Sequence, residues 1–350
     1  MKSRAIIHQK YNEPLMLDDI EIPDPKSNEV VVKLFASGIC GSQLINLTNP
    51  RLSSPELLGH EGTGLIVKKG KDVRHVNEDD HVLISWLPYD ANANTEYSKW
   101  SSITWNGQKI NSIIFTWAQH ALMDSQFVSK MDKDLERYTT SILGCAGIAG
   151  YGSVMNLVKI KPDDSVVVLG AGGLGILAIN AAKNLKARPI IAVDIDDEKL
   201  EFSKIFGSTH TINSKNSDFV NKIKEITNGG ADFVFDMVGI PELIESTILA
   251  TKEGVCGYSE GGTIVLAGFP LKKAEISPRY LIMGQRTYKG SRGGGCIAKR
   301  DFPKFYEDYR KGTLLLDKAV TKRYKLDQIN QAAEDLSTGK ILGRAIIEIS

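Results

Sequence analysis

Short apolar segments dominate the first part of the chain, to about Leu143, and predict β-strands. Runs of β-branched or aliphatic residues bounded by glycine, aspartate or asparagine, typical of strands that end in turns, are found at 30–35, 64–68 and 81–85. The stretch from 89 to 111 is instead polar and rich in Asn, Ser and Thr, yet it includes Trp100 and Trp105. Because tryptophans are unusual in a disordered linker, we expect an ordered surface lobe there.

Apolar strands and amphipathic helices alternate from about Gly147 onwards. The run 166–169 is apolar throughout, as is typical of a strand buried on both faces of a sheet, and a helix is expected to open around Gly172. The elements expected after it are the strand 189–194, the helices 197–206 and 218–227, the strand 232–237, the helix 241–251 and the strand 263–266. This βαβ spacing predicts an α/β fold with a doubly wound parallel sheet.

The alternation stops after Tyr288. Helix-like segments at 300–311 and 327–337 are followed by a last strand at 345–349. This tail is too short for a domain of its own, so we expect it to pack against the N-terminal part. Because 350 residues exceed what one compact core usually supports, two domains are expected.

Composition and charge are those of an ordinary globular protein. Apolar residues make up 42% of the chain and charged residues 24%, and 43 Lys and Arg balance 42 Asp and Glu. No basic stripe indicates a nucleic-acid partner, no apolar run is long enough for a membrane span, and the N-terminus does not resemble a signal peptide. The four cysteines are scattered, so we expect no disulfide framework and a cytoplasmic location.

A glycine-rich fingerprint follows the strand 166–169: Gly170, Ala171, Gly172, Gly173, Leu174 and Gly175. Gly170 permits a tight turn, Gly172 lets the backbone approach a pyrophosphate, and Gly175 lets helix and strand pack closely. The N-terminus of the helix that follows attracts phosphate groups. Together with the strand before it and the helix after it, the motif predicts a dinucleotide site.

Asp194 ends the second strand of this region. A carboxylate there accepts the ribose hydroxyls of NAD and repels the 2′-phosphate of NADP, so we expect a preference for NAD. Alternatively, Asp194 caps the helix expected to begin near Asp197, a role for which Asp196 is a competing candidate. Lys199 is expected to add a contact to the ribose, although a solvated helix lysine is nearly as good an interpretation.

Three residues beside glycines have the donor types of a catalytic zinc site: Cys40 in SGICGSQ, His60 in LLGHEGTG and Cys145 in LGCAGIAGYG. Two thiolates and one imidazole leave one corner of a zinc tetrahedron open, as in catalytic rather than structural sites. Each residue alone is more often buried or structural, so the hypothesis depends on their meeting in space. Cys256 and Cys296 lie in no ligand motif.

These motifs together resemble the zinc-containing alcohol dehydrogenase branch of the medium-chain dehydrogenase/reductase superfamily, over essentially the full length. The resemblance lies in GICGS around Cys40, GHEGTG around His60, GCAGIAGYG around Cys145, GAGGLG with Asp194, and GRAII near the C-terminus. It implies a GroES-like β-rich catalytic domain of residues 1–146 and 291–350, and a Rossmann NAD-binding domain of residues 147–290.

The resemblance also implies a role for each matching residue. Cys40, His60 and Cys145 would hold one catalytic Zn²⁺, Glu61 would approach the metal from behind, Ser42 would take the alcohol proton toward solvent, and Arg344 would contact the pyrophosphate of NAD. The implied reaction is hydride transfer between NAD and an alcohol, a polyol or a sugar-type hydroxyl. The implied assembly is a homodimer or homotetramer.

Several positions depart from the family pattern. The stretch 85–111, where many relatives hold a structural zinc, has no cysteine, so one zinc per chain is expected and the lobe would be held by Trp100, Trp105 and Tyr97. Gln43 replaces an acid that orients the histidine ligand, and an amide raises ligand basicity less than a carboxylate. Ile45 replaces a relay histidine. Trp86 either lines the substrate pocket or is a core aromatic.

Two alternatives to an alcohol dehydrogenase stay open at this stage. A zinc-free quinone or enone reductase of the same superfamily would typically lack the cysteine ligands. A non-catalytic NAD-binding relative would not need Cys40, His60, Glu61, Cys145 and Ser42 together. The identity of the substrate and the direction of the reaction do not follow from the sequence.

Overall fold

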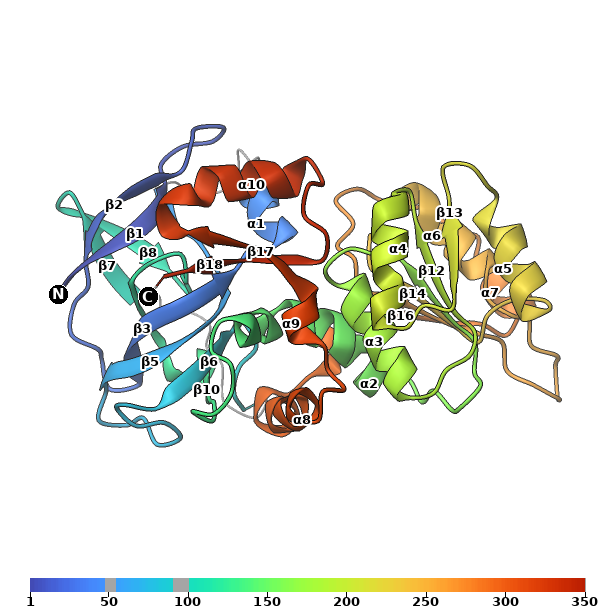
Figure 1. The fold of residues 1–350 in the computed structure, drawn as a ribbon, viewed down its shortest axis with the longest axis horizontal. Coiled ribbons are helices and arrows are strands. Elements are labelled where there is room, and N and C mark those ends of the chain that lie inside the picture. The colour runs from blue at the N-terminus through green and yellow to red at the C-terminus, as the bar shows by residue number, and fades with distance from the viewer. Residues whose placement is uncertain (48–54, 91–100, 350) are drawn as a thin grey trace. The chain divides into compact units, whose positions relative to one another are not determined.

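The computed structural model describes residues 1–47, 55–90 and 101–349 and divides into two compact units (Figure 1). The terminal unit comprises Met1–Cys145, Ile297–Arg310 and Leu316–Ser350. The inserted unit comprises Ala146–Cys296 and Lys311–Leu315. Both ends of the chain therefore contribute to one unit, as the blue and red ribbons of Figure 1 show.

The inserted unit is built on a parallel sheet of six strands in the order β13-β12-β11-β14-β15-β16. Its strands are β11 Val166–Leu169, β12 Ile190–Asp194, β13 His210–Asn213, β14 Phe233–Asp236, β15 Thr263–Leu266 and β16 Thr287–Gly290. Its helices are α2 Gly152–Leu157, α3 Gly175–Asn184, α4 Asp197–Phe206, α5 Phe219–Thr227, α6 Pro241–Leu249 and α7 Pro278–Met283. The strand order reverses at β11, so the predicted doubly wound sheet is confirmed, and ligands bind such sheets at this reversal point.

The terminal unit contains two mostly antiparallel sheets. One runs β10-β6-β5-β3-β18-β17, with β9 also paired to β3, and the other runs β4-β1-β2-β7-β8. The strands of the first are β3 Glu29–Gly38, β5 Glu61–Lys69, β6 His81–Ser85, β9 His120–Asp124, β10 Val128–Lys130, β17 Val320–Lys325 and β18 Arg344–Glu348. Those of the second are β1 Lys2–His8, β2 Met16–Glu21, β4 Glu56–Leu57, β7 Ser101–Trp105 and β8 Gln108–Ser112. The α-helices are α1 Gly41–Leu47, α8 Ala298–Arg310, α9 Leu316–Ala319 and α10 Ile329–Ser337.

Strand register brings the site residues to one end of the first sheet. β3 and β5 pair antiparallel with Ser37 opposite Gly62, so the end of β3 meets the beginning of β5. β18 pairs on the other side of β3, with Ile346 opposite Gly38. Cys40 follows the end of β3, His60 precedes β5, and Arg344 begins β18. The apolar core beneath these neighbouring strands fixes their spacing.

Part of the predicted surface lobe is a β-hairpin. β7 and β8 pair antiparallel across a turn at Asn106 and Gly107, whose φ angles of 50° and 75° fit an Asn-Gly hairpin. Trp105 is buried, and its indole N–H donates to Asp18 Oδ2 at 2.8 Å. Tyr97 and Trp100, expected to help hold the lobe, lie outside the described residues.

Candidate metal centre and nucleotide site

Four donor side chains converge in the terminal unit. The ligand atoms of Cys40, His60, Glu61 and Cys145 all lie within 4.8 Å of one another. The two cysteine sulfurs are 3.9 Å apart, close to the separation of about 3.8 Å that two Zn–S bonds of 2.3 Å give in a tetrahedron. His60 Nε2 is buried and has no hydrogen-bond partner. An orphaned imidazole nitrogen beside two correctly spaced sulfurs fits a zinc ion.

Two glycines permit this convergence. Gly59 has a φ of +95°, and a Cβ there would lie 2.4 Å from Thr116 Oγ1 and 2.7 Å from the Thr116 nitrogen. Gly144 ends the 3₁₀ helix Thr139–Gly144, and a Cβ there would collide with the carbonyl oxygen of Ile84. Any other residue at these two positions would push His60 or Cys145 away from Cys40.

The two thiols differ in their ionisation. A hydrogen bond from Cys145 outweighs burial and holds the pKa of Cys40 well below its usual range. The same pairing with Cys40, together with burial, raises the pKa of Cys145. The pairing therefore makes Cys40 the more acidic of the two thiols, and a divalent cation between the sulfurs would be balanced by two thiolates.

Glu61 lies behind the thiols, fully buried, and accepts a hydrogen bond from Arg344 Nη2. Burial alone would lower the pKa of Arg344, but the carboxylate of Glu61 and the two sulfurs outweigh it and raise that pKa. The pair is neutral as a whole, so the charge of Glu61 does not add to that of the thiolates. Glu61 thus lies in the cluster, and its approach to a metal from behind stays a prediction.

Helix α1 contributes Ser42 and Gln43, whose side chains contact the cluster. The exposed Ser42 places its hydroxyl 3.3 Å from Cys40 Sγ, to which it donates. Gln43 is buried and bridges the loop to the imidazole: its Oε1 accepts from the Gly59 N–H at 2.5 Å, and its Nε2 lies 2.8 Å from His60 Nδ1. The residue that stands in place of the family's acid therefore does hold the histidine ring.

The inserted unit has a cavity of about 420 Å³ at the reversal point of its sheet. It is lined by the glycine loop, the ends of β11, β12 and β14 and the helices that follow: Leu169, Gly170, Gly172, Gly173, Leu174, Gly175, Val193, Asp194, Ile195, Lys199, Ser214, Phe219, Met237, Val238, Ile240 and Leu243. A Cβ on Gly172 would meet no atom within 4 Å, whereas one on Gly175 would collide with the Gly170 carbonyl. Gly172 thus leaves open space for a phosphate group, and Gly175 serves the close packing of helix on strand.

Asp194 is held by three backbone donors at the rim of this cavity. Its Oδ2 accepts from the Ala171 N–H at 2.7 Å, and its Oδ1 accepts from the N–H groups of Ile195 and Asp196. A carboxylate offers about four lone-pair sites, so capacity remains for a ribose hydroxyl. The capping role belongs to Asp196, which accepts from the N–H groups of Glu198 and Lys199.

The structure thus places the predicted residues in two groups. Cys40, Ser42, His60, Glu61, Cys145 and Arg344 lie together in the terminal unit, and the glycine loop, Asp194 and Lys199 lie together in the inserted unit. Arg344 contacts Glu61 rather than lining the nucleotide cavity, so its contact with a pyrophosphate stays a prediction. Sequence reasoning missed Met237, Val238 and Ile240 in that cavity, although residues after a parallel strand next to the reversal point were foreseeable members.

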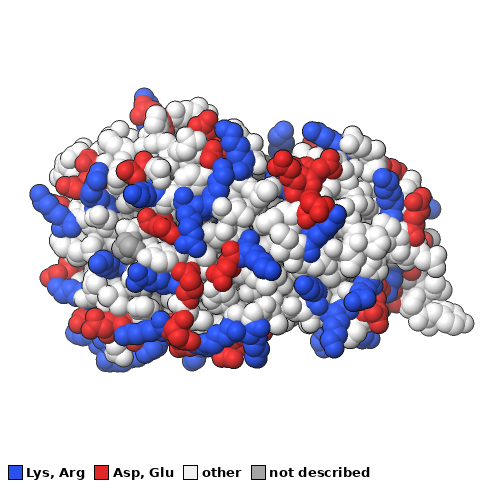
Figure 2. All heavy atoms as spheres, viewed as in Figure 1, with Lys and Arg blue, Asp and Glu red and all other residues white. Residues whose placement is uncertain are grey.

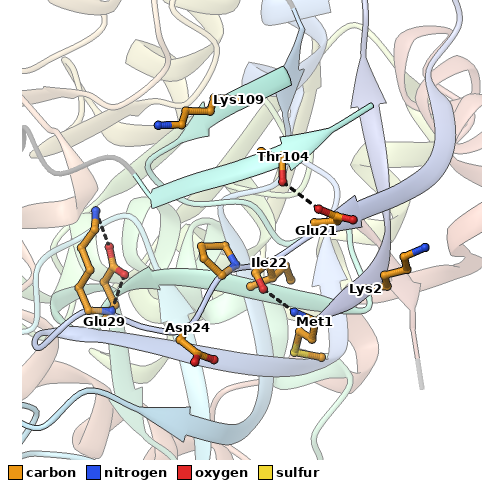
Figure 3. A pocket seen from close by; sticks show the side chains of 10 residues that line it. Met1, Lys2, Glu21, Ile22, Asp24, Glu29, Thr104 and Lys109 are labelled. Atoms are coloured by element: carbon orange, nitrogen blue, oxygen red, sulfur yellow. Dashed lines mark hydrogen bonds and ion pairs between the residues drawn. The ribbon is translucent and has the colours of Figure 1, made fainter. Parts of the chain in front are cut away.

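Another cavity, of about 500 Å³, lies in the terminal unit beside Met1 (Figure 3). Its charged lining alternates in sign, with Glu21, Asp24 and Glu29 near Lys2, Lys26 and Lys109. Its lining residues include no cysteine or histidine. Figure 2 likewise shows acidic and basic side chains interspersed over the face it presents.

None of the helices formed by residues 1–47, 55–90 and 101–349 has the length and apolarity to cross a membrane. All four cysteines are free thiols: Cys40 and Cys145 are buried, Cys296 is half-buried and Cys256 is exposed.

Comparisons with known proteins identify two family domains in the chain. Residues 26–133 match the alcohol dehydrogenase GroES-like domain, and residues 173–310 match the zinc-binding dehydrogenase domain. The chain is 30% identical to alcohol dehydrogenase 6 of Peromyscus maniculatus over 98% of this chain and 96% of that protein. It is 28% identical to an S-(hydroxymethyl)glutathione dehydrogenase of Escherichia coli over 99% of this chain and all of that one. Benzyl alcohol dehydrogenase of Acinetobacter calcoaceticus has the same structure with a TM-score of 0.89, at 31% identity over the full length of both chains.

Proposed function

Because the chain belongs to the zinc-containing alcohol dehydrogenase family, we propose that Cys40, His60 and Cys145 hold the zinc with which this NAD-dependent oxidoreductase acts on CH–OH groups. The observation that carries the assignment is the buried, unpartnered Nε2 of His60 beside two sulfurs 3.9 Å apart. Zinc supplies a Lewis acid there, which lowers the pKa of a hydroxyl group near it.

The residues around the metal ligands keep the site neutral and move the proton. Arg344 compensates Glu61, and two thiolates compensate a divalent ion, so no net charge is left buried. Ser42 is exposed and next to Cys40, so its hydroxyl is the group through which the proton of the alcohol passes toward solvent. With Ile45 five residues after Cys40, no imidazole follows it in that relay, and the proton goes from Ser42 to water.

The inserted unit binds and orients NAD. The glycine loop from Gly170 to Gly175 faces the cavity and offers room for the pyrophosphate beside the N-terminus of α3. Asp194 accepts a ribose hydroxyl and disfavours a 2′-phosphate, and Lys199 lies beside it at the rim. When bound there, NAD would supply the redox chemistry by accepting or giving a hydride.

The ligand assignment is tested by replacing Cys40 or His60 with alanine. Each variant should lose turnover with NAD and bind less than one tenth of the zinc of the wild type, as measured by mass spectrometry of dialysed protein. Cys256→Ala, which removes an exposed thiol, is the matched control and should keep both. An alanine variant that retains full zinc and activity would refute the assignment.

One zinc per chain is the expected stoichiometry. Of the four cysteines, two belong to the cluster, and Cys256 and Cys296 lie in the inserted unit. Metal analysis that returns two zinc ions per chain would contradict this proposal.

The substrate class we propose is an alcohol, a polyol or a sugar-type hydroxyl. The relatives named above act on benzyl alcohol and S-(hydroxymethyl)glutathione by name, and both compounds belong in a substrate panel with short alcohols, polyols and sugars. Formation of NADH identifies the substrate. Reduction of quinones or enones without zinc would instead favour the zinc-free reductase.

We further propose that the protein is a homodimer or homotetramer in the cytoplasm. β16 is an edge strand of the parallel sheet, and large apolar side chains of the same unit are exposed, among them Tyr258 (92%), Ile282 (73%) and Met283 (68%). Exposed apolar side chains next to an open sheet edge are typical of a surface that another copy covers. Light scattering of Ile282→Asp, compared with wild type, tests this assembly.

A further inference from the structure

Gln43 faces two groups that compete for its one amide oxygen. The Gly59 N–H donates to Gln43 Oε1, and the amide nitrogen on the other side of the same group faces His60 Nδ1. In this arrangement Nδ1 accepts a hydrogen bond, so a neutral His60 carries its proton on Nε2. Nε2 is the buried nitrogen without a hydrogen-bond partner, and the ligand atoms of His60 and the two cysteines lie within 4.8 Å of one another.

A metal at the cluster requires the opposite tautomer. The ion takes the lone pair of His60 Nε2, which leaves the ring proton on Nδ1 and makes Nδ1 a donor. Two donors, Gly59 N–H and His60 Nδ1–H, then face a side chain with one acceptor oxygen and one NH₂ group. Rotating the amide only moves the mismatch from His60 to Gly59.

The surroundings give this mismatch no way to relax. Gln43 is 7% exposed, so water has little access to either donor. Gly59 is packed against Thr116 at a φ of +95°, which fixes the direction of its N–H. A buried donor without an acceptor is costly, and the cost arises only when the metal is bound.

We propose that Gln43 makes metal binding at this site weaker and more exchangeable than a carboxylate at the same position would, because its amide satisfies the metal-free tautomer of His60 and opposes the metal-bound one. A carboxylate of the same length would accept from both donors at once. Gln43 is thus a positioning residue that sets the tautomer of His60. The inference rests on the proposed zinc ligands Cys40, His60 and Cys145.

The test compares zinc release from purified, zinc-loaded wild type and Gln43→Glu to a chromophoric chelator. The variant should bind zinc roughly 10–100-fold more tightly, the range by which outer partners of metal ligands change affinity. Gln108→Glu, which adds the same charge at an exposed position of β8, should match wild type. Equal or weaker binding by Gln43→Glu would overturn the inference, whereas a wild type that binds no zinc at all would overturn the proposed function as well.

The tautomer of His60 can be measured in the wild type, independently of whether Gln43→Glu folds. Nitrogen NMR of histidine-labelled protein, with His60 assigned by the loss of its signals in His60→Gln, reports which ring nitrogen carries the proton. The metal-free protein should have it on Nε2 and the zinc-loaded protein on Nδ1. A proton on Nδ1 in both states would contradict the role of Gln43.

Discussion

Arg344 and Glu61, 283 residues apart in the sequence, form a buried ion pair beside the thiols of Cys40 and Cys145. Each residue begins a strand, β18 and β5, and both strands flank β3. Only 5% of the arginine side chain and none of the glutamate side chain is exposed. The pair therefore compensates its own charge in a place where water cannot.

Removing one partner should be far worse than removing both. Arg344→Ala leaves Glu61 charged and buried and should destabilise the terminal unit by about 3–5 kcal/mol. The double variant with Glu61→Gln and Arg344→Met should recover most of this loss, because no buried charge remains. Calorimetric unfolding of the single and double variants gives the comparison, and a double variant no more stable than Arg344→Ala would speak against mutual compensation.

The glycine loop offers a matched pair of substitutions. Gly172→Ala should fold normally, because its Cβ meets no atom within 4 Å, yet raise the dissociation constant of NADH about tenfold (1.4 kcal/mol) by filling the phosphate space. Gly175→Ala should destabilise the inserted unit by about 1–3 kcal/mol, because its Cβ collides with the Gly170 backbone. NADH fluorescence titration and thermal unfolding separate the two effects. Normal NADH binding by Gly172→Ala would mean that the cavity is not the pyrophosphate site.

Asp194 should control the choice of cofactor. Asp194→Ala removes the acceptor for a ribose hydroxyl and the charge that repels a 2′-phosphate. Its kcat/KM with NAD should fall at least about tenfold, which corresponds to about 1.4 kcal/mol. Its kcat/KM with NADP should stay level or rise, so that the preference for NAD over NADP decreases. Asp196→Ala, which removes only the cap of α4, should lower stability and leave the NAD/NADP ratio unchanged. If wild type, Asp194→Ala and Asp196→Ala had the same ratio of kcat/KM with NAD to kcat/KM with NADP, Asp194 would be excluded as the group that selects the cofactor.

Asp236 should make the inserted unit less stable as the pH rises. It is 1% exposed at the end of β14, and burial raises its pKa although its Oδ1 accepts from the N–H groups of Val238 and Gly239. Because the folded pKa lies above the unfolded value of 3.8, stability falls as the pH rises from that value through the folded pKa.

Asp236→Asn keeps the acceptor oxygen and cannot ionise. Its melting temperature should equal that of the wild type near the unfolded pKa of 3.8, exceed it increasingly as the pH rises to the folded pKa, and keep a constant excess above that. If the variant's melting temperature exceeded that of the wild type by the same amount at every pH, ionisation of Asp236 would not be the cause of the loss of stability.

The sequence was sufficient wherever one local pattern determined the structure. Val166–Leu169 and Thr263–Leu266 are strands with the predicted bounds, and the helix Asp197–Phe206 begins and ends as predicted, because apolar runs, a capping Asp196 and a terminal Gly207 act over a few residues. The predicted strand at 30–35 is longer in the structure, Glu29–Gly38, because pairing with β5 and β18 extends it beyond its apolar run.

Contacts between distant segments were harder to foresee. The family pattern places Gln43 beside the His60 ring, but nothing near Gln43 in the sequence indicates that its amide also meets the Gly59 N–H, since the antiparallel pairing of β3 with β5 creates that contact. The Glu61–Arg344 pair depends in the same way on β18 lying beside β3. Asn106-Gly107, in contrast, was a visible hairpin signal in the lobe that the polar composition obscured.

The place of β18 also constrains the order of events during synthesis. The ribosome makes β3, Cys40, His60 and Cys145 first, then the whole inserted unit, and only afterwards Arg344 and the strand that borders β3. Domains fold as units as they emerge, so the inserted unit can fold while Glu61 still lacks its counter-ion. We therefore expect a nascent chain stalled before residue 344 to bind nucleotide already but to hold zinc more weakly than the full chain, because Glu61 still lacks its counter-ion.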